Sequence, residues 1–305
     1  MNHYYSLNEY LIHTFGEKVY KISLNGGMTC PNRDGTLDTR GCIFCSGGGS
    51  GDFAGSASLS VTEQIEDGKR LLSKKYSGNK YIAYFQAYTN TYAPIEKLHH
   101  LFYEAINHPD IVCLSIATRP DCLDDEIIRL LTELNRIKPV WIELGLQTIH
   151  EDSAGFIRRG YPLSVYDTAV GKLKAAGILV ITHMIVGLPH EDASMMYETA
   201  RYIARCGNDG IKIQLLHILN HTDLGKYYLE GNYTPLTLEE YMDILFHIIE
   251  LLPPDMVIHR ITGDGPKKLL LAPLWSGDKK KVLNTIQAEL DKRNIIQGKL
   301  YKEVT

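Results

Sequence analysis

Three cysteines lie close together in the chain, and their spacing suits metal ligands. Cys30, Cys42 and Cys45 form the pattern Cys-x11-Cys-x2-Cys within TCPNRDGTLDTRGCIFCSGGGSG. Thiolates three residues apart can bind one centre, and a loop of this length can bring the third back to it. Three thiolates on a four-iron cluster leave one iron without a protein ligand, which is the open position that a catalytic centre needs. The spacing therefore predicts a [4Fe–4S] cluster on Cys30, Cys42 and Cys45.

A zinc site made of three cysteines and one histidine is the alternative for the same residues, because zinc also prefers thiolates. The histidines nearest in sequence, His13 and His99, do not have the paired spacing of zinc ligands. The tract SGGGSG begins directly after Cys45, and its glycines allow the backbone to approach a bulky cofactor closely. These features favour the cluster.

Six cysteines occur in the chain, and we expect none of them to form a disulfide in a reducing compartment. Cys113 and Cys206 are predicted to be small buried hydrophobic residues. Cys122 follows the third expected strand, where it would lie on the catalytic face of the fold. We therefore treat Cys122 as a candidate catalytic residue, with a plain structural role as the alternative.

Short β-rich runs alternate with helical patterns through most of the chain, which indicates a parallel sheet joined by right-handed crossovers. Strands are expected at Val19–Leu24, Tyr81–Phe85, Ile111–Ala117, Val140–Leu146, Leu179–Val186 and Gly210–Leu216. Helices are expected at Thr62–Lys74, Ile95–Ile106, Asp124–Asn135, Ser164–Ala176 and Ala193–Cys206. The fold class is therefore α/β, either an open sheet or a partial barrel, with its chemistry at the carboxyl ends of the strands.

The remaining sequence predicts one more strand between two helices. PLTLEEYMDILFHIIELLPP reads as an amphipathic helix, MVIHRITGDGP as a strand and turn, and SGDKKKVLNTIQAELDKRN as a terminal helix. No linker or repeat separates this part from the rest. We expect a single domain over residues 1–305, with a barrel core at about 18–220 and a C-terminal α/β extension at about 221–305.

Composition and charge exclude a few classes of function. The chain has 305 residues, 44% of them hydrophobic, and a net charge of −4. This charge gives no general attraction to nucleic acid or to an anionic membrane, although it leaves room for a local basic patch. No segment resembles a secretory signal or a membrane span, so the expected location is cytoplasmic.

The cysteine loop, the strand order and the later motifs resemble those of the radical S-adenosylmethionine (SAM) superfamily. The likeness is to its Elp-type, tRNA-modifying branch and, within that branch, to a YtqA/YhcC-like family of MnmL-like enzymes. It runs from Tyr5 to about Asn294, and the long gap between the first two cysteines departs from the commoner Cys-x3-Cys-x2-Cys pattern. The resemblance implies a partial (βα)6 TIM-like barrel, one [4Fe–4S] cluster, and SAM bound to the open iron and cleaved to a 5′-deoxyadenosyl radical.

The resemblance also implies cofactor-binding positions at the strand ends. Gln86, Ala87 and Tyr88 occupy the place of a GGE-like turn, without its acidic residue. ELGLQT matches an element whose carboxylate lies close to SAM, and the Arg of FIRRGY matches a partner for the SAM carboxylate. THMIVGLP matches a segment that lies against the adenine. The cofactor-binding candidates are Gln86, Ala87, Tyr88, Asn90, Glu143, Gln147, Arg159, His183, Gly187, Leu216 and His217.

Each of these positions also has a plainer interpretation. Asn90 and its neighbours could form an ordinary polar turn, and His183 could be a buried core histidine. Lys212 alternates with apolar residues and could face either the interior of the barrel or the outside. Arg260 and Asp264 in RITGDGP match an R-x-x-x-D-x-P element and are candidate substrate-facing catalytic residues, with a plain turn as the alternative.

By the same resemblance the substrate is tRNA, and the reaction converts the 5-carboxymethylaminomethyl side chain of wobble uridine to aminomethyl. An electron donor such as flavodoxin or ferredoxin is expected. Arg33, Arg40, Lys267, Lys268 and Lys279–Lys281 could form a phosphate-binding stripe, or simply a solvated surface. A radical enzyme for a small metabolite or a porphyrinogen-like substrate is the second hypothesis. A non-catalytic zinc scaffold is the third.

Overall fold

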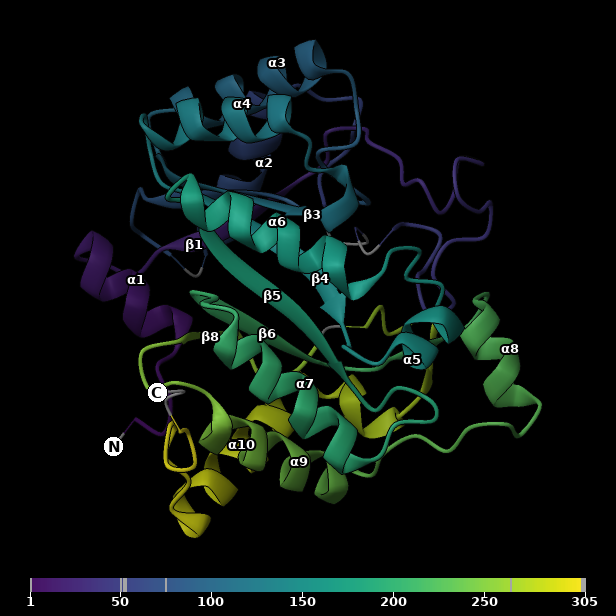
Figure 1. The fold of residues 1–305 in the computed structure, drawn as a ribbon. Coiled ribbons are helices and arrows are strands. Elements are labelled where there is room, and N and C mark those ends of the chain that lie inside the picture. The colour runs from purple at the N-terminus through teal and green to yellow at the C-terminus, as the bar shows by residue number, and fades with distance from the viewer. Residues whose placement is uncertain (1, 50, 52–53, 75, 264, 303–305) are drawn as a thin grey trace.

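The fold is a curled sheet of seven parallel strands covered by helices, a partial barrel of the TIM type (Figure 1). The computed structural model describes the whole chain except residues 1, 50, 52–53, 75, 264 and 303–305. The sheet order is β1-β2-β3-β4-β5-β6-β8. These strands are β1 (Tyr20–Leu24), β2 (Tyr81–Phe85), β3 (Ile111–Thr118), β4 (Val140–Gln147), β5 (Leu179–Val186), β6 (Gly210–Leu215) and β8 (Val257–Arg260).

The predicted α/β half-barrel is confirmed, and the expected strands and helices are present with ends shifted by at most two residues. The helices that follow the first strands are α2 (Val61–Leu72), α3 (Ile95–Asn107), α4 (Asp125–Asn135), α6 (Leu163–Ala175) and α7 (Ala193–Arg205). Their ends follow local chemistry. Ser60 and Glu63 form a capping box at the start of α2, and the Asp124 side chain accepts from the backbone N–H of Ile127 at the start of α4.

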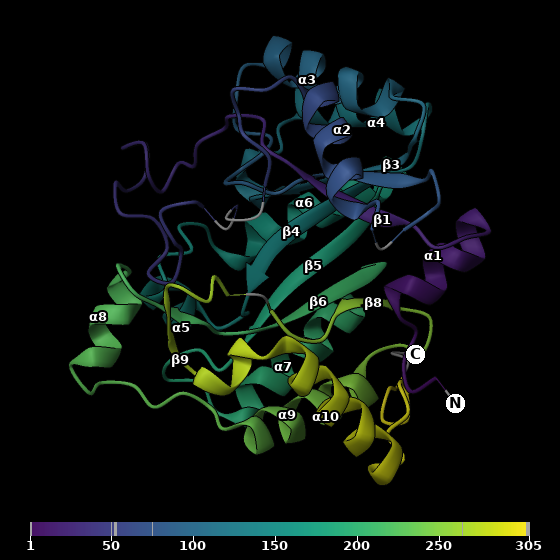
Figure 2. The same ribbon diagram turned by 180° about the vertical axis from the view of Figure 1, so that it is seen from behind.

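The C-terminal part joins the barrel sheet directly, because β8 pairs in parallel with β6. This part also contains α9 (Leu238–Leu251) and α10 (Lys279–Arg293), which lie on the same side of the sheet as α7 in both ribbon views (Figures 1 and 2). The sequence did not indicate the shorter elements of the chain, several of which lie before the C-terminal part. These are α5 (Glu151–Phe156), α8 (Asp223–Leu229), the 3-10 turns Pro120–Cys122 and Leu274–Gly277, and the antiparallel pair β7 (Ile218–Leu219) and β9 (Leu270–Ala272).

A short helix, α1 (Leu7–Phe15), closes the end of the barrel where the strands begin. Buried Leu11 packs in one apolar cluster with Ile82, Trp141 and Ile181, which come from β2, β4 and β5. The sequence analysis left this segment unassigned. A second cavity, lined in part by Tyr10, Trp141 and Val257, also lies beside α1. The loop after β1 lies at the carboxyl ends of the strands, at the opposite end of the sheet from α1 (Figure 2).

Strand alternation sorts the side chains into an outer apolar face and a layered interior. Outward residues such as Leu24, Phe85 and Ile142 pack under the helices in the main core. Along the barrel axis the interior changes from apolar to polar. An apolar layer at the start of the strands is followed by a polar layer, which consists of Lys21, Tyr84, Ser115, Glu143, His183 and Lys212.

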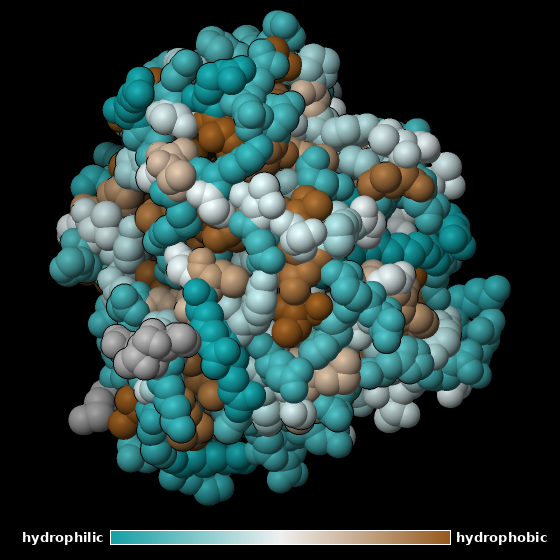
Figure 3. All heavy atoms as spheres, in the orientation of Figure 1, coloured by the Kyte–Doolittle hydropathy of each residue, from teal (hydrophilic) through white to brown (hydrophobic). Residues whose placement is uncertain are grey.

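The face of the molecule drawn in Figure 3 is mostly hydrophilic, with hydrophobic residues in small groups between polar ones. Among the described residues, no helix is long and apolar enough to cross a membrane.

Candidate functional site at the carboxyl ends of the strands

A cavity of about 450 Å³ opens at the carboxyl ends of the strands and contains the three clustered cysteines in its wall. Such a volume suits a small-molecule or cofactor site. Of the residues predicted from the sequence, those in the wall are Cys30, Cys42, Cys45, Gln86, Tyr88, Glu143, Gln147, Arg159, His183, Leu216, His217 and Arg260. The fold therefore brings together residues from six strands that are far apart in the sequence.

The cysteine loop is held in place by side chains that do not themselves suit iron. The Arg33 guanidinium donates to the backbone oxygens of Cys45 and Ser46, at 2.9 and 2.6 Å. Arg33 was a candidate phosphate contact, yet here its guanidinium shapes the loop. The Tyr88 hydroxyl donates to the Gly47 oxygen at 2.7 Å, which ties the glycine-rich tract to the end of β2.

Gly49 and Tyr88 show why this tract needs glycine. The backbone of Gly49 has a φ of 59°, and a Cβ at this position would lie 2.3 Å from the Tyr88 ring. Both the left-handed conformation and the lack of space exclude a side chain. Tyr88 itself has a φ of 60°, which is uncommon for a non-glycine residue and typical of functional sites.

The chemistry of the three cysteines fits an iron–sulfur cluster. Cys30, Cys42 and Cys45 share the wall of one cavity, and cysteine thiolates are the usual ligands of such clusters.

Burial raises the pKa of the Cys42 thiol to about 11, and the neighbouring Cys45 adds to the shift. The Asn32 amide donates toward the Cys42 sulfur at 3.5 Å and would support a thiolate there. A thiol in this environment does not ionise by itself at neutral pH, whereas a metal that binds it removes the proton outright. These properties disfavour a free cysteine nucleophile, and the role of the three cysteines as cluster ligands stays a prediction.

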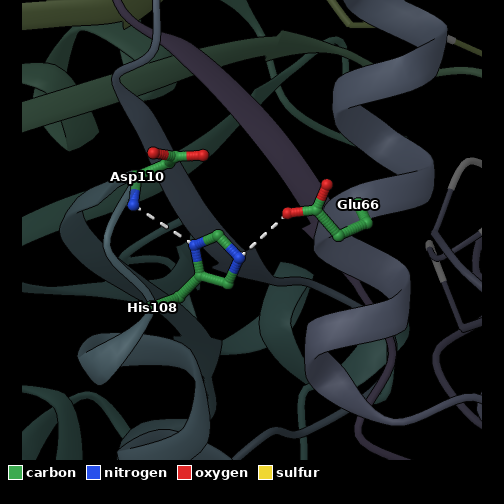
Figure 4. Close-up of side chains that lie close together, drawn as sticks. All are labelled: Glu66, His108 and Asp110. Carbon is green, nitrogen blue, oxygen red and sulfur yellow. Dashed lines mark hydrogen bonds and ion pairs between the residues drawn. The ribbon is translucent and has the colours of Figure 1, made fainter.

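Glu66, His108 and Asp110 form an ion-pair network and not a second metal site (Figure 4). His108 Nε2 lies 3.1 Å from Glu66, and His108 Nδ1 accepts from the Asp110 backbone N–H at 3.2 Å, so Nε2 carries the proton. Lys69 supplies the cation, with its ammonium 2.7 Å from Glu66 and 2.5 Å from Asp110. This network lies at the start of β3, at the other end of the strands from the cysteines.

Glu143 is the centre of the polar layer and is fully buried. One carboxylate oxygen accepts from Lys21 at 2.7 Å and from Ser115 at 2.8 Å. The other accepts from His183 at 2.8 Å and from Lys212. Burial by itself would raise the pKa of Glu143, but Lys21 and Lys212 lower it well below its usual range. The carboxylate is therefore ionised, and the chain itself supplies four donors to it.

The neighbours of Glu143 have pKa values set by burial. Burial and the adjacent Lys212 lower the pKa of His183 to about 4, so His183 is neutral and donates its Nε2–H to Glu143. Burial lowers the pKa of Lys212 to about 7, despite the opposite effect of Glu143. The Lys212 ammonium also lies 3.2 Å from the Tyr84 hydroxyl.

Lys212 faces the interior, which the sequence analysis left open. Lys212 is 4% exposed and forms part of the cavity wall together with Gln214, which lies two residues further along β6. The inward orientation of Lys212 could have been predicted from Lys212 and Gln214 together, because two polar residues at i and i+2 of an apolar strand share one face.

Gln147 and Arg159 lie at the end of β4 with different roles. Gln147 has a φ of 69°, and its side-chain oxygen is buried with no hydrogen-bond partner in the described part of the chain. Such an oxygen suits a donor on a bound ligand. Arg159 donates instead to backbone oxygens, 2.9 Å from that of Tyr161 and 2.6 Å from that of Thr148. Its guanidinium braces the turn beside the cavity, and its contact with SAM stays a prediction.

Four of the predicted site residues lie outside the cavity wall. Ala87 is buried behind Tyr88, and the Asn90 amide donates to the Ala117 backbone oxygen at 2.9 Å, which links the ends of β2 and β3. The Gly187 backbone oxygen accepts from Tyr233. Burial raises the pKa of Cys122 to about 12, which disfavours its thiolate. Asp264 lies outside the described residues.

Comparison with known proteins decides the family. A family model described as "Radical SAM superfamily" matches residues 39–203, more than half of the chain, and one described as "Radical_SAM C-terminal domain" matches residues 208–292. The chain belongs to the radical SAM superfamily. Radical SAM enzymes use a [4Fe–4S] cluster and SAM, so the predicted family and enzyme class are confirmed.

Similar proteins match between about half and nearly all of the chain. YtqA of Bacillus subtilis (strain 168) is 46% identical over 99% of this chain and 94% of its own. YhcC of Escherichia coli (strain K12) is 36% identical over 87% of this chain and 85% of its own. A tRNA uridine(34) acetyltransferase of Methanocaldococcus jannaschii is 28% identical over 52% of this chain and 30% of its own.

A solved structure of Elp3 from Methanocaldococcus infernus shares the fold. Its TM-score is 0.69 at 17% identity, over 92% of this chain and 64% of that one. The likeness covers the C-terminal part as well as the barrel, which agrees with the pairing of β8 into the barrel sheet.

Proposed function

We propose that this radical SAM enzyme modifies the 5-position side chain of wobble uridine in tRNA and converts carboxymethylaminomethyl to aminomethyl. The observation that carries the proposal is a cavity that joins three cysteines to a buried cationic lysine. The cysteines would hold the cluster that supplies the radical chemistry, and the lysine suits an acidic substrate group. A partial likeness to a tRNA uridine(34) acetyltransferase supports a wobble-uridine substrate.

Cys30, Cys42 and Cys45 would hold the cluster, and three thiolates in the wall of one cavity fit it. The cluster and SAM together supply a carbon radical that removes a hydrogen atom from the substrate. The buried side-chain oxygen of Gln147 is a suitable acceptor for a ligand N–H in the same cavity. Leu216 and Ile185 are apolar wall residues that suit a flat ring.

The substrate side chain would enter the cavity from the solvent side. Hydrogen abstraction from the methylene between its amine and carboxylate would leave a carbon radical. Loss of one electron from this radical to an acceptor, such as the oxidised cluster, would give an iminium, and water would convert the iminium to the aminomethyl group and glyoxylate. Lys267 and Lys268 are exposed and directly follow the wall residues Gly265 and Pro266, so they are placed to contact tRNA phosphates near the mouth. An electron would come from a donor such as flavodoxin or ferredoxin.

Nucleoside mass spectrometry of tRNA from cells lacking the gene tests this function. We expect aminomethyl-type wobble uridines to fall and the carboxymethylaminomethyl form to accumulate. The wild-type gene should restore the pattern, and a Cys45→Ser gene should not. Unchanged wobble uridines would reject the tRNA substrate. If the purified protein still makes 5′-deoxyadenosine, that result would favour the small-metabolite hypothesis.

A further inference from the structure

The polar layer carries more positive charge than its own carboxylate balances. Lys21 and Lys212 both contact Glu143, and no second carboxylate among the described residues lies within 4.0 Å of either ammonium nitrogen. His183 is neutral and adds no charge of either sign. A buried cation in excess is costly unless an anion or a bound group pairs with it. With Lys212 protonated, the described part of the layer is therefore short of one negative charge.

Of the two lysines, Lys212 is the one in contact with the cavity. An ammonium group has three N–H donors, and the described residues offer Lys212 two partners, Glu143 and Tyr84. Lys212 forms part of the cavity wall, so its third donor can reach a bound molecule. Lys21 is not part of that wall, and its ammonium packs over the rings of Tyr84 and Trp141.

We propose that Lys212 binds a carboxylate of the substrate at the floor of the cavity, with Glu143 as the residue that positions Lys212. This inference rests on the proposed function, because the carboxymethylaminomethyl group ends in a carboxylate. The missing anion of the polar layer is then supplied by the substrate, and the product, which has lost the carboxylate, no longer satisfies Lys212. Binding thus discriminates substrate from product.

The depth of Lys212 favours a carboxylate over a backbone phosphate. The Lys212 side chain is 5% exposed and lies in the interior of the barrel between β5 and β8. A carboxylate on a slender arm can reach this depth while the nucleoside stays near the mouth. A phosphate of the RNA backbone would have to bring its flanking sugars into the barrel with it.

The test compares two RNA stem-loops, one with carboxymethylaminomethyluridine at the wobble position and one with the matching neutral carboxamide. We expect the reconstituted wild-type enzyme to prefer the carboxylate about 10- to 100-fold in kcat/KM, as for a hydrogen bond between charged groups. Lys212→Met should bring this ratio close to one. Equilibrium binding of the two RNAs to protein without SAM should give the same two results, a preference for the carboxylate in the wild type and none in Lys212→Met.

Lys21→Met is the matched control, because it removes the other ammonium that contacts Glu143 without changing the cavity wall. This variant should keep the preference for the carboxylate. In Lys212→Met, Glu143 retains Lys21, Ser115 and His183, so the variant should fold. A preference retained by Lys212→Met, or equal use of the two RNAs by the wild type, would overturn this inference alone. Failure of the wild type to convert either RNA would overturn the proposed function and this inference with it.

Discussion

Glu143 accepts hydrogen bonds from side chains on β1, β3, β5 and β6, so one residue connects five strands of the half-barrel. The sequence analysis placed this glutamate among the cofactor-binding candidates at the strand ends. It did not predict Lys21 and Lys212, because strand order and register decide which residues meet across a barrel, and neither can be read from one strand alone. The same limit kept the orientation of Lys212 open.

Removing the Glu143 carboxylate should destabilise the fold strongly. Glu143→Ala leaves the buried Lys212 and the half-buried Lys21 without an anion, and we expect a loss of about 3–5 kcal/mol in the free energy of unfolding. Chemical denaturation measures this loss. Asp125→Asn, which breaks an exposed pair with Lys172, is the control and should change stability little. If Glu143→Ala lowered the free energy of unfolding no more than Asp125→Asn, that result would contradict a stabilising role for the polar layer.

The pKa of Lys212 predicts how activity depends on pH. Burial lowers this pKa to about 7, so the ammonium is present below pH 7 and is lost as pH rises. Glu143, Lys21, His183, Tyr84 and Arg260 face Lys212, and among these His183 stays neutral above its pKa of about 4.

We therefore expect kcat/KM for the carboxylate RNA to fall as pH rises above about 7, and kcat/KM for the carboxamide RNA to stay flatter. Lys212→Met should remove the difference between the two profiles. Parallel profiles for both RNAs in the wild type would argue against a cationic Lys212 in substrate binding.

At the scale of elements, the loop between β1 and α2 was predicted only in part. Its role as a cofactor loop could be predicted from the sequence, but the side chains that hold it in place could not. Cysteine spacing and the glycine tract pointed to a cofactor loop. The supports of the loop, Arg33 and Tyr88, come from inside the loop and from the end of β2, and only the fold brings Tyr88 to Gly49. The strand β8 was predicted but its pairing with β6 was not, and the helix α1 was left unassigned, because their places in the barrel depend on partners far away in sequence.

Gly49→Ala should displace the cysteine loop and lower the iron content of the reconstituted protein. An added Cβ would lie 2.3 Å from the Tyr88 ring, and the left-handed backbone adds about 1–3 kcal/mol of strain. Gly47→Ala is the matched control in the same tract, because a Cβ there meets nothing within 4 Å. Iron analysis and the visible absorption of the cluster give the result. Equal iron in both variants would show that the contact of Gly49 with Tyr88 does not shape the loop.

At the scale of the whole molecule, strand and helix alternation was enough to predict the α/β half-barrel, since period-two and helical patterns are local. The cavity was predictable as a location, because polar residues and cysteines follow several strands and the carboxyl ends of parallel strands meet at one edge. Its internal electrostatics were not predictable in the same way. They arise from Lys21, Glu143 and Lys212 on three separate strands.

Conversion of the substrate by the purified protein tests the central claim most directly. The anaerobically reconstituted and reduced protein is incubated with SAM and tRNA carrying carboxymethylaminomethyluridine. Mass spectrometry should show aminomethyluridine and 5′-deoxyadenosine forming together, and neither should form with Cys42→Ser. Formation of 5′-deoxyadenosine without any change in the wobble uridine would contradict the account of the substrate, and absence of both products with a fully loaded cluster would contradict the account of the site.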